Sequence, residues 1–127
     1  MRIDSHHHFW NYDPVEYGWI GEGMDVLKRD FGPADLGKVA KATKMDGFVS
    51  VQARQTIEET KWLCGLAEKS PLIRGVVGWV PLADFEVEKI LDSVSTPSLK
   101  GIRHVVQGEP DPEFILGEEY NLSLIHI

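Results

Sequence analysis

The sequence has a single cysteine, no long apolar run and no excess of positive charge. Cys64 has no second cysteine to pair with, which excludes an internal disulfide framework and is typical of a reducing, cytoplasmic compartment. No stretch is apolar for long enough to cross a bilayer, and residues 1–6 lack the apolar core of a signal peptide. The formal net charge of −7 argues against nucleic acid or an anionic membrane surface as a partner.

Short apolar segments alternate with amphipathic segments along the whole chain. We predict strands at residues 2–5, 47–52, 73–80 and 99–106, and helices at residues 33–43, 57–69, 84–94 and 113–120. Thr56 and Glu59 form a predicted capping box before the second helix, and Asp84 is the predicted N-cap of the third. This order predicts an α/β fold with a parallel sheet covered by helices.

Two architectures fit this order, an open doubly wound sheet and a (β/α)8 TIM barrel. The chain contains neither GxGxxG after a strand nor GxxxxGK[ST], the glycine-rich loops with which open sheets hold phosphates, so we favour the barrel. A complete barrel needs about 250 residues. Residues 1–127 are therefore expected to form only the first four or so β/α units, the truncated N-terminal half of one barrel domain.

A histidine cluster ends the first predicted strand, in the run Asp4-Ser5-His6-His7-His8. Side chains alternate along a strand, so His6 and His8 share one face and His7 points to the other. At the carboxyl end of a barrel strand, His6 and His8 would face the mouth, where two imidazoles can share a zinc ion. Asp4 on the same face could fix a histidine tautomer. The alternative is a histidine cluster on a solvated turn.

Polar residues at two further strand ends are candidates for substrate contact. Arg103 has a planar guanidinium that suits carboxylate or carbonyl oxygens, and His104 could polarise a carbonyl. Because neighbours in a regular strand point to opposite faces, we expect only one of the two to reach the mouth. Gln52 ends the second strand, with Ser50 expected on the same face. The alternatives are an arginine paired with a helix carboxylate and a glutamine that caps its strand.

Residues 9–32 form a connection that is too long for a simple strand-to-helix loop and is rich in aromatic side chains. Trp10 and Trp19 could line a pocket or could hold this loop in place. Trp79 and Cys64 are expected in the core.

With these residues in place, the chain resembles the amidohydrolase superfamily. Within it, the chain is similar to the predicted metal-dependent barrel hydrolases that include L-fuconolactonase and 2-pyrone-4,6-dicarboxylate lactonase. The matching stretches are residues 2–10, 17–20, 29–36, 48–53, 75–80 and 100–107.

The resemblance implies hydrolysis of a carboxylic ester bond in a small-molecule lactone, either a sugar lactone or a dicarboxylate lactone. It implies that His6 and His8 bind a divalent metal such as zinc, and that Arg103 and His104 lie near the substrate. In the family, an ionised aspartate from a later strand activates water. The one later histidine, His126, has surroundings that match nothing in the family, so the general base is expected beyond the end of this chain.

Two other functions stay open at this point. A barrel decarboxylase of the same superfamily is one, although the loop around Trp19 and the Arg103-His104 strand end favour a lactonase. The other is a non-catalytic α/β fragment that folds loosely or associates with itself as a homo-oligomer, because half a barrel exposes two sheet edges and an apolar interior. We predict that the 127 residues alone have no meaningful turnover.

Overall fold

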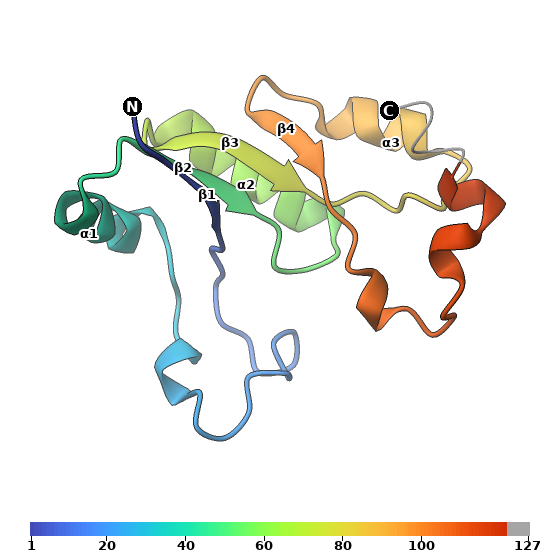
Figure 1. Ribbon diagram of the computed structural model, residues 1–127, viewed down its shortest axis with the longest axis horizontal. Helices are drawn as coiled ribbons and strands as arrows, with labels where there is room; N and C mark the ends of the chain where they lie inside the picture. Colours follow the sequence, from blue (N-terminus) through green and yellow to red (C-terminus); the bar gives the residue numbers. More distant parts are fainter. Residues whose placement is uncertain (122–127) are drawn as a thin grey trace.

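The computed structural model describes residues 1–121 and contains one parallel sheet with helices packed against it (Figure 1). The strands are β1 (Ile3–His7), β2 (Gly47–Val51), β3 (Ile73–Gly78) and β4 (Leu99–Ile102), and the helices are α1 (Pro33–Thr43), α2 (Ile57–Lys69) and α3 (Val87–Val94). The strand order is β1-β2-β3-β4, so each strand pairs in parallel with the next along the chain. The predicted α/β alternation with a parallel sheet is confirmed.

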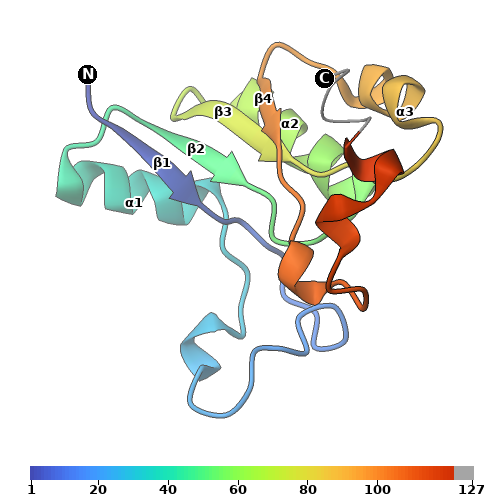
Figure 2. The ribbon, with the colours of Figure 1, turned by 45° about the vertical axis from the view of Figure 1, so that its right-hand side comes forward.

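The loops that follow β1, β2 and β4 extend beyond the carboxyl ends of the strands, as Figures 1 and 2 show. Short 3-10 helices lie in the first and last of these regions, at Asp25–Leu27, Val106–Gly108 and Phe114–Leu116. No helix among residues 1–121 is long and apolar enough to cross a membrane.

The main core lies between the sheet and the first two helices. Pro33 starts α1 at a position where its missing N–H costs nothing, and Leu36 and Ala40 face inward one turn apart. The buried members of the core are Phe9, Leu36, Ala40, Phe48, Leu63, Cys64, Ile73 and Val76. The expectation that Cys64 is a core residue is confirmed.

Ser50 faces the helix side of the sheet, so the prediction that it shares a face with the pocket was wrong. Its Oγ lies 3.1 Å from Nε2 of His7, whose ring packs edge-on against Phe9 and Phe48 in the core. The large apolar side chain of Phe48 is buried against the helices, and the alternation of the strand then turns Ser50 to the same side.

Several element boundaries differ from the predicted ones. Strand β4 ends at Ile102, and residues 106–108 form a 3-10 turn instead of more strand. Helix α3 begins at Val87, because Oδ1 of Asp84 accepts from the N–H of Glu86 and thereby closes a turn ahead of the helix. The predicted helix at residues 113–120 is broken into a 3-10 turn and a helical segment from residue 118, with Gly117 between them. His126 lies outside the described residues.

The long connection after β1 has a small core of its own. Trp10 and Phe31 form an antiparallel bridge with two backbone hydrogen bonds, of 3.2 and 2.9 Å, which closes the loop at its base. Trp10, Tyr17 and Ile20 are buried together in this loop. The loop therefore has a defined conformation next to the ends of the strands.

Candidate active site

His6 and His8 lie on the same side of the chain at the end of β1, as the alternation predicts. Their Nε2 atoms are 3.1 Å apart, and their rings meet edge to face with centroids 4.9 Å apart. His7 points to the opposite side, into the core, where burial lowers its pKa to about 4 and keeps the ring neutral. The predicted placement of His6 and His8 is confirmed, and their role as metal ligands stays a prediction.

The tautomer of His8 is determined by the backbone of β2. Nδ1 of His8 lies 3.0 Å from the carbonyl oxygen of Val51, which can only accept, so Nδ1 carries the proton and Nε2 presents its lone pair toward His6. Burial lowers the pKa of His8, which favours this neutral form. Asp4, which was predicted to orient a ring, accepts from the backbone N–H of His6 at 3.0 Å instead.

The two imidazoles fit half of a zinc site. Tetrahedral zinc with Zn–N bonds of about 2.0–2.1 Å places two nitrogen ligands about 3.3 Å apart, close to the 3.1 Å between the two Nε2 atoms. A neutral His8 with Nδ1–H bound to a carbonyl is the state in which histidine binds zinc. Within residues 1–121, no group of three or more His, Cys, Asp or Glu side chains could hold a metal ion, so a complete ligand set needs residues from elsewhere.

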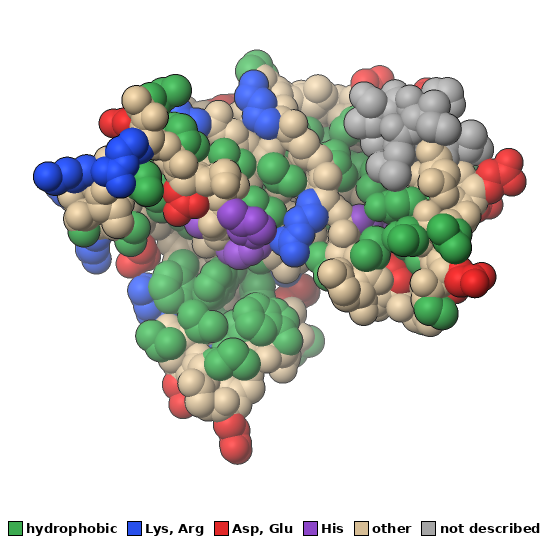
Figure 3. Space-filling model, viewed as in Figure 1, with side chains coloured by type: hydrophobic (Ala, Val, Ile, Leu, Met, Phe, Trp, Pro, Cys, Tyr) green, Lys and Arg blue, Asp and Glu red, His purple; other side chains and the backbone are tan. Residues whose placement is uncertain are grey.

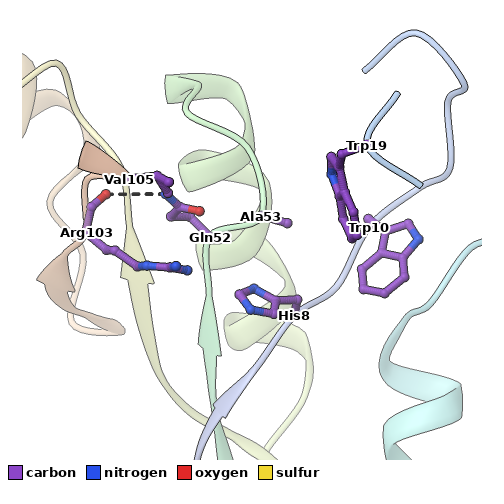
Figure 4. Close-up of a pocket in the computed structure, with 7 residues that line it drawn as sticks. All are labelled: His8, Trp10, Trp19, Gln52, Ala53, Arg103 and Val105. Atoms are coloured by element: carbon purple, nitrogen blue, oxygen red, sulfur yellow. Dashed lines mark hydrogen bonds between the residues drawn. The ribbon is translucent and has the colours of Figure 1, made fainter. Parts of the chain in front are cut away.

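A pocket of about 280 Å³ lies next to His8 at the carboxyl ends of the strands. It is lined by His8, Trp10, Trp19, Gln52, Ala53, Arg103 and Val105. Figure 4 shows that Arg103 and Gln52 lie on one side of this pocket and the two indoles on the other, with His8 between them. Parallel strands bring their carboxyl ends to one edge, and this places the residues that directly follow β1, β2 and β4 around one cavity.

Gln52 connects two of these strand ends. Its side chain is 1% exposed, and its Nε2 donates to the carbonyl oxygen of Arg103 across 3.4 Å.

On the face seen in Figure 3, a histidine surface lies directly beside a basic side chain, above the hydrophobic surface of the long loop. A ligand in the pocket therefore meets cationic and hydrogen-bonding groups on one side and apolar surface on the other.

His104 does not line the pocket that Arg103 lines. Its Nδ1 accepts from the indole Nε1 of Trp79 at 3.1 Å, and its Nε2 lies 2.6 Å from a carboxylate oxygen of Glu109. Its ring stacks on Phe114 with centroids 5.0 Å apart, beside a second cavity of about 310 Å³. The two neighbours thus point to different sides, and the substrate contact predicted for His104 stays a prediction. Trp79, expected in the core, is half-buried and hydrogen-bonds to this ring.

Glu59 is a residue of this region whose role the sequence did not reveal. The capping box is half formed, since Thr56 accepts from the N–H of Glu59 at 3.2 Å, but the Glu59 carboxylate does not reach back to Thr56. Its Oε2 instead accepts from the N–H groups of Ala53 and Arg54, at 3.0 and 2.7 Å, which are part of the loop beside the pocket. The capping-box spacing was the available signal, and it predicted the wrong donor for the Glu59 carboxylate, the Thr56 N–H instead of the Ala53 and Arg54 N–H groups.

Residues 3–121 of the chain match the amidohydrolase family. The chain belongs to the amidohydrolase family. The four-stranded parallel sheet with its helices corresponds to the first units of an amidohydrolase TIM barrel, which confirms the predicted fold class.

Known amidohydrolases resemble the chain over nearly all of its length. An L-fucono-1,5-lactonase of Burkholderia multivorans is 40% identical over 111 residues, or 87% of this chain and 38% of the relative. An L-fucono-1,5-lactonase of Burkholderia ambifaria is 33% identical over 116 residues, or 91% of this chain and 40% of the relative. The chain therefore spans about two fifths of the length of these relatives.

A crystal structure of an amidohydrolase from Burkholderia multivorans with bound zinc superimposes with a TM-score of 0.93 at 36% identity, covering 98% of this chain and 44% of that one. An amidohydrolase from Bifidobacterium longum, 22% identical, superimposes with a TM-score of 0.64 and covers 98% of this chain and 46% of that one. The second likeness concerns the fold alone.

Proposed function

We propose that the protein is a metal-dependent lactone hydrolase, in which this chain supplies two zinc ligands, His6 and His8, and one side of the substrate pocket. The observation that carries the proposal is the convergence of the two Nε2 atoms to 3.1 Å beside the pocket of Arg103 and Gln52. It is supported by the two similar lactonases of 40% and 33% identity and by the zinc in a similar structure.

In the proposed reaction, a water oxygen attacks the lactone carbonyl carbon, the bond from that carbon to the ring oxygen breaks, and the ring oxygen takes a proton to give a hydroxy acid. A zinc ion bound at His6 and His8 would polarise the carbonyl or the attacking water. The Val51 carbonyl keeps His8 in the tautomer with a free Nε2. Arg103 would hold the carbonyl oxygen and then the product carboxylate with its planar guanidinium.

The group that takes the proton from water is not assigned within residues 1–121, because none of the described residues that line the pocket carries a carboxylate. We infer that it comes from a later strand of the barrel. The partner is accordingly a small lactone. A cytoplasmic location, a homo-oligomeric state and a chain truncated to half of one domain stay predictions.

Zinc binding by the purified, metal-free chain tests the site directly. Isothermal titration with zinc is compared for the wild type, His6→Gln, His8→Gln and the control His7→Gln, whose imidazole points into the core. We expect His6→Gln and His8→Gln to weaken zinc binding by about tenfold or more, and His7→Gln to retain it, with circular dichroism confirming that each variant is folded. Equal zinc affinity in all four proteins contradicts the proposal.

A turnover assay of the 127-residue chain tests the inference that the general base lies outside the described pocket. A pH-indicator assay with L-fucono-1,5-lactone follows acid release, and measurement of carbon dioxide would reveal a decarboxylase. The 127-residue chain is expected to bind zinc but not to hydrolyse the lactone, since its described pocket contains no general base. Hydrolysis by this chain at an enzyme-like rate would refute that assignment of the base.

A further inference from the structure

We propose that Trp19 binds the lactone ring by stacking and thereby determines which substrates the pocket accepts. The inference rests on the proposed function and concerns the same pocket. The two indoles that line the cavity differ in exposure: Trp10 is 9% exposed, whereas Trp19 is 60% exposed.

Trp10 holds the loop in place. Its indole Nε1 donates to the carbonyl oxygen of Leu27 at 3.2 Å, and its ring contacts Phe31 with centroids 4.7 Å apart. The backbone bridge between Trp10 and Phe31 adds two hydrogen bonds. All of these contacts lie within the loop, so Trp10 is needed for its conformation and is not available to adapt to a ligand.

Trp19 lines the pocket but leaves much of its apolar surface in water. Figure 4 shows its indole nearly edge-on, with a face turned across the pocket toward Arg103. An exposed indole beside a guanidinium-lined cavity is a surface that a bound ring would cover, and burial of that surface favours binding. A ring between Trp19 and Arg103 would also lie next to Nε2 of His8.

The backbone on either side of Trp19 is held in position before any ligand binds. Tyr17 and Ile20 are 2% and 4% exposed, and the N–H of Ile20 donates to the carbonyl oxygen of Tyr17 at 2.9 Å, which forms a turn around Trp19. Arg54 lies over the Tyr17 ring at 5.9 Å and pairs with Glu16 at 3.1 Å. The loop therefore presents Trp19 at little entropic cost when a ligand binds.

The chemistry of an indole face defines the ligand it would accept. The face of the ring is electron-rich, so it attracts the weakly positive C–H groups of a saturated ring. A lactone ring with C–H groups on one face and oxygens at its edge would place the C–H face on Trp19 and its oxygens toward Arg103 and Gln52. Among the described lining residues Arg103 is the one cation, which suits a ligand with a single carboxyl-derived group.

The test compares variants at this position with a lactone analogue that is not hydrolysed, a six-membered sugar lactam. Binding of the lactam and of zinc is titrated calorimetrically for the wild-type chain, Trp19→Ala, Trp19→Phe and the control Trp62→Phe, which changes an indole on α2 that packs against the main core. We expect Trp19→Ala to weaken lactam binding about tenfold and Trp19→Phe to retain most of it. Trp62→Phe should bind the lactam normally, and zinc affinity should be unchanged in all four proteins.

Each other outcome overturns the proposal in a distinguishable way. Lactam affinity that is the same in Trp19→Ala and the wild type would show that stacking does not contribute, while the proposed function stands. Zinc binding without lactam binding in the wild type would reject the role of Trp19 and leave the metal site intact. Absence of both would reject the proposed function together with this inference.

Discussion

Replacing Glu59 should reveal how α2 stabilises the loop beside the pocket. Glu59 is 1% exposed, and one carboxylate oxygen accepts both the Ala53 and the Arg54 N–H. Ala53 lines the pocket, and Arg54 pairs with Glu16 of the long loop. The carboxylate therefore connects the first turn of α2 to two loops at the carboxyl end of the sheet.

The magnitude follows from the groups that each substitution leaves without a partner. Glu59→Ala removes the acceptor of two backbone N–H groups in a half-buried loop, at about 1–3 kcal/mol for each, so we expect a loss of about 2–6 kcal/mol in the free energy of unfolding. Glu59→Gln keeps an oxygen that can accept both N–H groups and no longer buries a charge. Its unfolding free energy at neutral pH should lie within about 1 kcal/mol of the wild type.

The pH dependence of the unfolding free energy separates the effect of the Glu59 charge from the effect of the side chain's size and hydrogen bonds. Burial raises the pKa of Glu59 in the folded protein above the ordinary value of 4.5, against the opposing effect of its two backbone hydrogen bonds. The folded chain thus holds this proton more tightly than the unfolded chain. The stabilisation that comes from this tighter proton binding is fully present below the pKa that Glu59 has in the unfolded chain. It is lost as pH rises through the pKa that Glu59 has in the folded chain. Glu59→Gln lacks this dependence.

Urea denaturation followed by circular dichroism, at several pH values from about 4 to 8, measures the unfolding free energy of wild type, Glu59→Gln and Glu59→Ala. The difference between wild type and Glu59→Gln isolates Glu59, because all other titrating groups are shared. As pH rises, the unfolding free energy of the wild type should fall relative to that of Glu59→Gln. A difference that is independent of pH, or an alanine variant as stable as the wild type, would refute the reasoning.

Other predictions concern the support of the sheet and the long loop. Thr60 Oγ1 accepts from the Trp79 N–H at 2.7 Å and donates to the Trp79 carbonyl at 2.8 Å. Thr60→Val should therefore lower the free energy of unfolding, measured by heat or urea, by about 2–4 kcal/mol, and Thr60→Ser should lower it much less. Equal losses in both variants would show that the hydroxyl is unimportant. Gly78→Ala should destabilise by about 1–3 kcal/mol, since its Cβ would lie 2.5 Å from Cγ2 of Thr60, and unchanged unfolding would contradict this close packing. Burial, with the charge of Glu59, raises the pKa of Tyr17 to about 12. One of the three tyrosines should therefore ionise late in a titration followed at about 295 nm. The stability that depends on the neutral phenol of Tyr17 is present below the ordinary pKa of tyrosine and is lost as pH rises through about 12.

Local pattern was sufficient for much of the fold and for the centre of the candidate site. Hydrophobic periodicity, the helix-starting proline Pro33 and the N-cap Thr56 depend on neighbours within one or two turns, so they predicted α1 and α2 closely. Strand alternation depends only on the backbone, and it predicted that His6 and His8 share a side while His7 turns away. The absence of phosphate-binding glycine loops favoured a barrel over an open sheet, and the family resemblance agreed with that choice.

Contacts between distant residues decided the rest. Arg103 and His104 are adjacent in the chain, but β4 ends before them, so only the structure shows that Arg103 lines the pocket with Gln52 and that His104 packs between Trp79 and Glu109. The sequence by itself determined which residues could bind a metal or a carboxylate, because that depends on side-chain chemistry and strand periodicity. Tertiary structure alone decided which of them meet, because that depends on where each strand stops and on what packs beside it.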